Sequence, residues 1–170
     1  MINITLPDNT VRQYPEGTNS FEIARSISEG LARNVLSATV NGEIWDINRP
    51  INSDARLKLN TWDSAEGKFT MWHSSAHLLA EAVEQLYPGV KFGIGPAIEN
   101  GFYYDMDFGD KQITAEDLKA IEEKMLTLAR EKQTYNRKEV SKSQALEYFS
   151  RKNDEYKVEL IQDLEDGQIT

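Results

Sequence analysis

The sequence contains no cysteine, only two histidines and no long run of apolar residues. Without cysteine the chain has neither disulfides nor thiolate metal ligands, which fits a cytoplasmic protein. No apolar stretch approaches the roughly 18 residues that a transmembrane helix needs. The first residues, 1–7, lack the basic and apolar regions of a secretory signal. We therefore expect a cytoplasmic protein with no membrane-spanning segment.

Basic residues are also scarce, with 19 Lys and Arg against 28 Asp and Glu and a formal net charge of −9. A broad nucleic-acid-binding face normally needs clustered Lys and Arg to neutralise phosphates, so the charge argues against such a face. A small local patch on an acidic protein remains compatible with binding the end of one RNA.

The two histidines, His73 and His77, lie four residues apart in a segment that is predicted to be helical. Residues i and i+4 share one helix face, and imidazole suits proton transfer or metal ligation near neutral pH. A zinc protease motif would need Glu at position 74, where Ser stands, so further ligands would have to come from carboxylates such as Asp105 or Asp107. The structural alternative is that both imidazoles only form hydrogen bonds with neighbouring backbone groups. We interpret the pair as part of a functional site and leave the metal open.

Residues 1–62 have the pattern of a small sheet crossed by one helix. Ile2, Ile4 and Leu6 alternate with polar residues, as in a strand. A helix begins near Asn19 and ends at Gly30. We also expect a second strand near 10–14, a hairpin whose turn is Asn41-Gly42, and a last strand with Leu57 and Leu59. The predicted order of elements is therefore β-β-α-β-β-β.

Residues 63–170 indicate a second α+β domain. The polar segment 63–68 is predicted to be a linker, and a helix is predicted from 69 to 87. The apolar stripe of that helix consists of Trp72, Ala76, Leu79, Val83 and Leu86. Downstream we expect a hairpin at Asn100-Gly101, a strand over 102–108, a helix from Thr114 to Lys132 with Leu118, Ile121, Met125 and Leu128 buried, and another helix from Ser141.

Several residues downstream of the histidine pair are further candidates for a functional site, and each has two interpretations. Gly95 and Pro96 allow a close backbone approach, either to a ligand or at a tight bend between strands. Tyr104 and Asp105 line a pocket or belong to a core strand. Apolar residues alternate around Lys157, which suggests that its side chain points inward, although most lysines are solvated.

Three segments carry a resemblance to the editing domain of bacterial threonyl-tRNA synthetase: His73-Ser74-Ser75-Ala76-His77-Leu78-Leu79, Ile94-Gly95-Pro96, and Asn100-Gly101-Phe102-Tyr103-Tyr104-Asp105. Residues 1–62, with Val40-Asn41-Gly42-Glu43 in their middle, are similar to the TGS domain that precedes it. The resemblance implies an α+β chain with an N-terminal β-grasp (ubiquitin-like) TGS domain at 1–62 and an α+β editing domain at 63–170.

The resemblance also implies a threonine–tRNA ligase activity for the full-length protein, with ATP, Mg and a zinc ion in a catalytic core that these residues do not include. This region then contributes to hydrolysis of seryl-tRNA(Thr), its partner being the tRNA acceptor end that carries the seryl ester. Catalytic roles fall on His73, His77 and Lys157. Substrate-binding roles fall on Gly95, Pro96, Tyr104 and Asp105. No cofactor is required in this region, and the full-length enzyme is expected to be a homodimer.

One feature of the family pattern is missing from the sequence. The family completes the editing site with a Cys-x-x-x-His segment downstream, whereas this sequence has no cysteine and no third histidine. We therefore expect an N-terminal fragment whose editing domain is truncated before that segment. Two alternatives remain: a TGS-containing binding or regulatory module without catalysis, and a metal-dependent hydrolase that uses His73 and His77.

Overall fold

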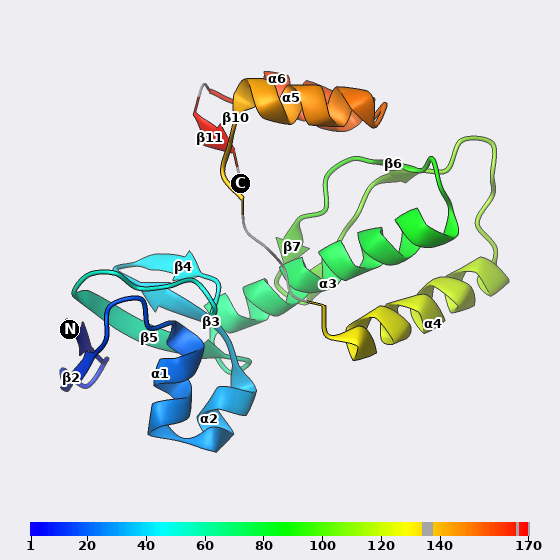
Figure 1. Cartoon of the computed structure of the whole chain (residues 1–170). Helices are drawn as coiled ribbons and strands as arrows, with labels where there is room; N and C mark the ends of the chain where they lie inside the picture. Colours follow the sequence, from blue (N-terminus) through cyan, green and yellow to red (C-terminus); the bar gives the residue numbers. More distant parts are fainter. Residues whose placement is uncertain (134–137, 166, 170) are drawn as a thin grey trace. The chain divides into compact units, whose positions relative to one another are not determined.

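The chain forms two compact units, Met1–His73 and Ser74–Thr170, in a computed structural model that describes residues 1–133, 138–165 and 167–169 (Figure 1). The division falls within helix α3 (Ala65–Leu86), so that helix contributes residues to both units. In the described residues no helix is both long and apolar enough to cross a membrane.

The first unit is an α+β fold built on a five-stranded sheet. Its elements before α3 are β1 (Ile2–Thr5), β2 (Val11–Tyr14), α1 (Ser20–Ile27), α2 (Glu29–Asn34), β3 (Val35–Val40), β4 (Glu43–Trp45) and β5 (Ala55–Thr61). The strand order is β2-β1-β5-β3-β4, with β1 and β5 parallel and the other neighbours antiparallel. This mixed sheet, crossed by a helix, confirms the predicted β-grasp fold class.

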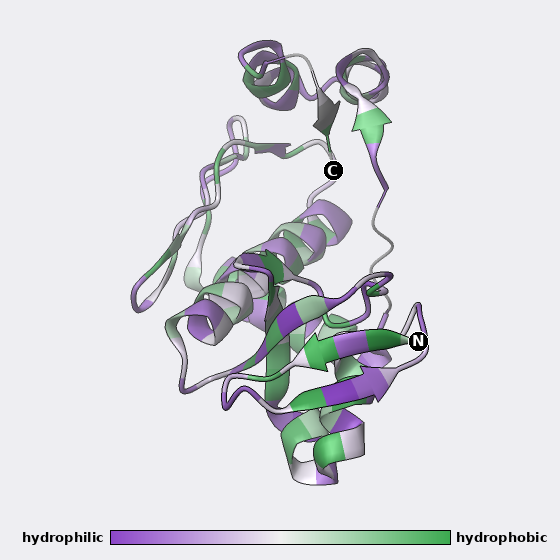
Figure 2. Cartoon of the chain, turned by 90° about the vertical axis from the view of Figure 1, so that its left-hand side faces the viewer, coloured by the Kyte–Doolittle hydropathy of each residue, from purple (hydrophilic) through white to green (hydrophobic). Residues whose placement is uncertain are grey.

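The core of the first unit lies between the sheet and α1. Hydrophobic and polar residues alternate along β1 (Figure 2). Ile2 and Ile4 are buried in the core. Ile23 on α1 is fully buried in the same cluster. The apolar face of the strand and the apolar face of the helix therefore pack against each other, as the period of two in the strand and of about 3.6 in the helix predict.

The loops of the first unit partly match the prediction. Asn41 and Gly42, with φ of 50° and 92°, form the expected turn between β3 and β4. Gly30, however, does not end the helix. The break lies at Ser28, which is the C-cap of α1 and whose hydroxyl caps α2 by accepting from the backbone N–H of Leu31, so Gly30 lies inside the second short helix.

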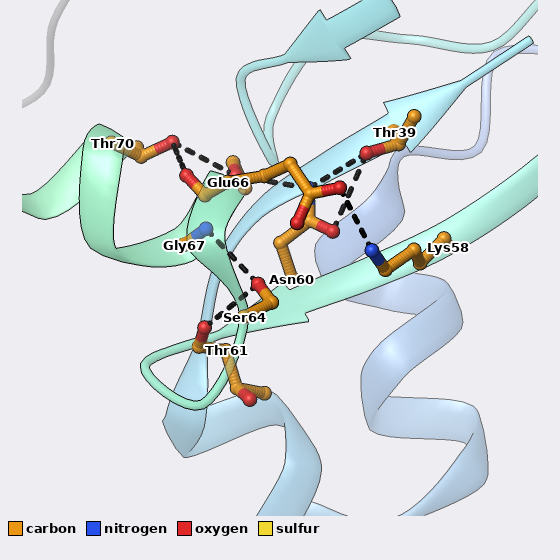
Figure 3. Close-up of polar contacts among 9 residues, drawn as sticks. Thr39, Lys58, Asn60, Thr61, Ser64, Glu66, Gly67 and Thr70 are labelled. Carbon is orange, nitrogen blue, oxygen red and sulfur yellow. Dashed lines mark hydrogen bonds and ion pairs between the residues drawn. The ribbon is translucent and has the colours of Figure 1, made fainter. Parts of the chain in front are cut away.

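Helix α3 begins at Ala65, four residues before the predicted start, so residues 65–68 of the predicted linker are helical. The hydroxyl of Ser64 accepts from the backbone N–H of Gly67 at 3.0 Å and donates to the Thr61 carbonyl (Figure 3). Gly67 packs so tightly that a Cβ there would lie 1.9 Å from the Thr61 carbonyl oxygen. The polar composition of this segment reflects capping chemistry rather than an extended linker.

A buried polar cluster fixes the first turns of α3 against β3 and β5 within the first unit (Figure 3). Asn60 is fully buried, and its amide donates to the hydroxyls of Thr39 at 2.9 Å and Ser37 at 3.3 Å. Thr70 of α3 donates to the same Ser37 hydroxyl at 2.9 Å. Because these groups satisfy one another, the cluster joins helix to sheet without leaving a buried amide unpaired.

In its described residues the second unit combines the rest of α3 with short strands and three further helices. Its elements are β6 (Lys91–Phe92), β7 (Ala97–Ile98), β8 (Gly101–Phe102), β9 (Met106–Asp107), α4 (Ala115–Glu131), β10 (Val140–Ser141), α5 (Lys142–Arg151), α6 (Glu155–Gln162) and β11 (Gln168–Ile169). The pairs β6–β9, β7–β8 and β10–β11 are antiparallel. The hairpin predicted near Asn100 is confirmed, but the single strand over 102–108 is divided into β8 and β9.

The core of the second unit joins α3, α4 and the short strands. Val83, Phe92 and Ile121 are its buried centre. Two residues of the predicted stripes are instead exposed: Leu86 by 37% and Leu118 by 62%. In the first turn of α4, Asp117 accepts a hydrogen bond from the hydroxyl of Tyr87, the residue that follows α3, and the adjacent Leu118 faces solvent.

Two helix starts in this unit follow the predicted capping signals. Thr114 and Asp117 form a capping box at α4, and Ser141 and Gln144 form one at α5. In each box the hydroxyl and the partner side chain satisfy backbone N–H groups that the helix itself leaves unbonded.

Candidate functional site

A pocket of about 680 Å³ in the second unit brings together three of the residues that the sequence singled out. His77, Tyr104 and Lys157 come from α3, from the segment between β8 and β9, and from α6. The described residues that line the pocket are His77, Ala80, Glu81, Glu84, Gly89, Val90, Lys91, Phe92, Tyr104, Phe149, Lys152, Asn153, Asp154 and Lys157. Residues separated by up to 80 positions in sequence thus face one cavity, which the sequence spacing alone does not reveal.

His77 lies on the exposed side of α3, one residue after the buried Ala76. The neighbouring turn presents Ala80, Glu81 and Glu84 to the same pocket. Since i, i+3, i+4 and i+7 positions line one helix face, this set is the face that α3 turns towards the pocket. An imidazole there can take or give a proton at a bound ligand.

Lys157 lies in the first turn of α6, where its side chain is half-buried and its Nζ donates to the carbonyl oxygen of Gly93 at 2.9 Å. The side chain of Asp154 caps the helix by accepting from the backbone N–H of Lys157 at 3.1 Å. The alternation of apolar residues around Lys157 suggested an inward direction, and the side chain does turn inward, although the segment is a helix.

Tyr104 forms one wall of the pocket. Its ring packs edge-on against Phe92, with centroids 5.8 Å apart and planes at 90°. A Cβ on Gly95 would lie 2.2 Å from Cδ2 of Tyr104, so the glycine permits the ring to rest on the backbone. The close approach predicted at Gly95 is therefore an approach to a side chain of the same chain.

The pocket mixes charges of both signs, with Glu81, Glu84 and Asp154 beside Lys91 and Lys152. Burial raises the pKa of the Tyr104 phenol, and the negative charge of Asp154 raises it further. The phenol therefore keeps its proton at neutral pH and can donate a hydrogen bond. The Glu155 carboxylate raises the pKa of Lys91 through a hydrogen bond and through charge attraction.

Known proteins resemble the chain along its whole length. Residues 2–61 match the TGS domain family. Over 170 residues, all of this chain, it is 61% identical to the threonine–tRNA ligase of Cytophaga hutchinsonii and 57% identical to that of Parabacteroides distasonis. This chain belongs to the threonine–tRNA ligase family. It matches the N-terminal region of those ligases and spans 26% of the length of each of these relatives.

The other site residues predicted from the ligase resemblance lie outside the set of described residues that lines this pocket. His73 is one turn before His77 on α3, exposed, and stacked on Phe69 with ring centroids 5.8 Å apart. Pro96 is exposed, and its carbonyl accepts from the backbone N–H of Tyr103 at 3.1 Å. Asp105 lines a separate cavity of about 420 Å³.

The sequence does not decide whether His73 and His77 bind a metal ion. Among residues 1–133, 138–165 and 167–169, no group of three or more His, Cys, Asp or Glu side chains is arranged to hold a metal ion. Asp105 and Asp107, suggested as further ligands, both line the smaller cavity rather than the one that His77 faces.

Sequence reasoning missed Asp154 and Lys152 as pocket residues. The signal for Asp154 was present, since an Asp three residues before Lys157 is an N-cap pattern for α6. Lys152 carried no comparable signal. Its Nζ approaches the carboxylate of Glu84 at 3.4 Å, a contact between residues 68 positions apart in sequence.

Proposed function

We propose that this chain is the part of a threonine–tRNA ligase that contributes to hydrolysis of seryl-tRNA(Thr). The observation that carries the proposal is the convergence of His77, Tyr104 and Lys157 on one pocket in a chain of this family. Serine lacks one methyl group of threonine, and a site built for threonine discriminates by only about 1–3 kcal/mol. A second pocket that admits only the smaller side chain removes the error.

In this proposal the histidines act on water. His77, with His73 one turn earlier on α3, orients or deprotonates the water that attacks the seryl ester carbonyl. The attack gives a tetrahedral oxyanion, and its collapse releases serine and the RNA 3′-hydroxyl. A general base suits this step because water is a weak nucleophile near neutral pH.

Lys157 and Tyr104 have supporting roles in this proposal. The Lys157 ammonium, which now donates to the Gly93 carbonyl, holds the RNA end or the developing negative charge. The Tyr104 ring and Gly95 shape the part of the pocket that receives the serine side chain. Pro96 and Asp105 bind substrate only if the segment that carries them moves, since neither lines the pocket with His77.

The charging of tRNA is proposed to lie in the part of the longer ligases that this chain does not match. We infer that charging of tRNA(Thr) with threonine, its use of ATP, Mg and zinc, and dimer formation belong to the three quarters of the relatives' length that this chain does not span. The acidic balance of this chain is consistent with RNA contacts that are confined to the acceptor end.

Ester hydrolysis tests the proposal directly. Seryl-tRNA(Thr) and threonyl-tRNA(Thr) are incubated with this chain and with a form extended through the downstream Cys-x-x-x-His segment expected from the family. The proposal predicts that the extended form cleaves only the seryl ester and that His77→Ala or Lys157→Ala slows it at least tenfold, with Lys119→Ala on the outer face of α4 as the control. Equal cleavage of the seryl ester by all variants would overturn the roles of His77 and Lys157, and no cleavage by the extended form would favour a TGS binding module.

A further inference from the structure

The first turn of α6 is joined to β6 by two parallel side-chain contacts. Glu155 Oε2 accepts from Lys91 Nζ at 2.8 Å, and Lys157 Nζ donates to the Gly93 carbonyl at 2.9 Å. Glu155 and Lys157 are two positions apart on α6, and their partners are also two positions apart, since Lys91 begins β6 and Gly93 directly follows it. The pair of contacts therefore acts as a two-point attachment that fixes both the place and the direction of the helix start.

Tyr156 adds a third contact between the other two. Its hydroxyl donates to Asp107 Oδ2 of β9 at 3.3 Å, and its ring centre lies 5.9 Å from Lys91 Nζ. Since Lys91 and Asp107 are opposite each other in the β6–β9 pair, one ribbon supplies the partners of three consecutive α6 residues.

The position of Lys157 Nζ is set by the helix that carries it. Helix α6 has only eight residues, and a helix of that length is marginal without tertiary contacts. The lysine side chain is a flexible four-carbon stem, so its ammonium is fixed only as well as the backbone from which it starts. The Lys91 and Glu155 side chains are 37% and 79% exposed, and a pair this exposed contributes little to overall stability.

We propose that Lys91 and Glu155 are positioning residues for Lys157, holding the first turn of α6 on β6 so that the ammonium faces the pocket. Lys91 lines the pocket, but in this proposal both residues act through Lys157 rather than on the ester. The effect of this pair on hydrolysis rests on the proposed function, whereas its effect on the position of Lys157 does not.

The position of Lys157 is measured without any reference to catalysis. The intact chain is treated with an amine-acylating reagent, and the rate of modification at Lys157 is followed by peptide mass spectrometry. A hydrogen-bonded, half-buried amine reacts slowly. Lys91→Glu and Glu155→Lys should each raise the rate at Lys157 about two- to fivefold, the range for loss of one exposed ion pair.

The swapped double variant, Lys91→Glu with Glu155→Lys, restores the ion pair but places a glutamate opposite Asp107, so it should bring the Lys157 rate below that of either single variant and towards that of the parent chain. The matched control is Lys119→Glu, which breaks an exposed pair with Glu123 on α4 and should leave Lys157 unchanged. Unchanged Lys157 rates in both single variants, or a swapped variant that reacts as fast as the single variants, would overturn the proposal.

Hydrolysis of seryl-tRNA(Thr) gives the second measurement, in the form of the protein that cleaves it. The single variants should lower kcat about two- to fivefold, and the swapped variant should recover part of that loss. If Lys157→Ala cleaves like the parent, the proposed function fails, and the acylation rates still decide whether Lys91 and Glu155 position Lys157. If Lys157→Ala is slow but both single variants cleave like the parent, the positioning proposal fails alone.

Discussion

Replacing Gly95 by alanine tests how tightly the pocket wall is packed. The added Cβ would lie 2.2 Å from Cδ2 and 2.4 Å from Cε2 of Tyr104, whereas ordinary contact begins near 3.4 Å. The ring must withdraw by about 1 Å, although it is already packed edge-on against the buried Phe92. Overpacking of this kind costs about 1–3 kcal/mol. At about 2–4 °C per kcal/mol, Tm should fall by about 2–12 °C.

A double-mutant cycle separates this clash from other effects of the substitution. Tyr104→Ala removes the ring, so adding Gly95→Ala to it should cost almost nothing, and the two changes should be non-additive by about 1–3 kcal/mol. Gly30→Ala is the matched control: its Cβ would meet nothing closer than 3.9 Å within α2, and alanine there should preserve or raise Tm. Thermal unfolding by circular dichroism measures all four variants. An unchanged Tm for Gly95→Ala, or additive effects, would refute the packing described here.

Three further predictions concern stability. Gly67→Ala places its Cβ 1.9 Å from the Thr61 carbonyl oxygen, which belongs to backbone, so it should lower Tm more than Gly95→Ala does; an equal or smaller loss would contradict this. Asn60→Ala removes the donor of two buried hydrogen bonds and should lower the free energy of unfolding in urea by about 1–3 kcal/mol, whereas a neutral result would exclude the network. The backbone N–H of Thr114, with Lys111 and Tyr87, holds the pKa of Asp117 well below its usual range, so its stabilisation is present above about pH 4 and is lost as pH falls. The Tm difference between the parent and Asp117→Asn should therefore shrink from pH 7 to pH 3, and a constant difference would contradict it.

Local signals predicted much of the fold because they act through the backbone. The Asn41-Gly42 turn needs two residues at positive φ, which few other pairs supply. The capping boxes at Thr114 and Ser141 likewise depend on residues three positions apart. The prediction of a helix end was wrong where two neighbouring residues could each end the helix. Glycine commonly ends a helix, yet Ser28 provides the cap two residues before Gly30.

The exposed Leu118 shows where periodicity fails. Its spacing matches the buried stripe of α4, but burial depends on what lies opposite, and there Tyr87 bonds to Asp117 instead. Long-range packing of this kind is absent from the sequence pattern.

The candidate site was predictable in part. The histidine spacing and the family resemblance identified His77, Tyr104 and Lys157, and these three face one pocket. The spacing could not show that Lys157 reaches the Gly93 carbonyl 64 positions away, or that Asp105 faces a different cavity. The catalytic and binding roles of all these residues stay predictions.

The most direct test of the account is whether the pocket recognises a seryl ester. The chain has only two histidines, so their ring proton resonances can be followed by NMR and assigned with His77→Ala. A non-hydrolysable analogue of 3′-seryl-adenosine is titrated in, beside its threonyl counterpart. The account predicts that the seryl analogue shifts the His77 resonances and that the threonyl analogue, with its extra methyl group, does so far more weakly. Equal shifts with both analogues, or no shift of His77 with either, would contradict it.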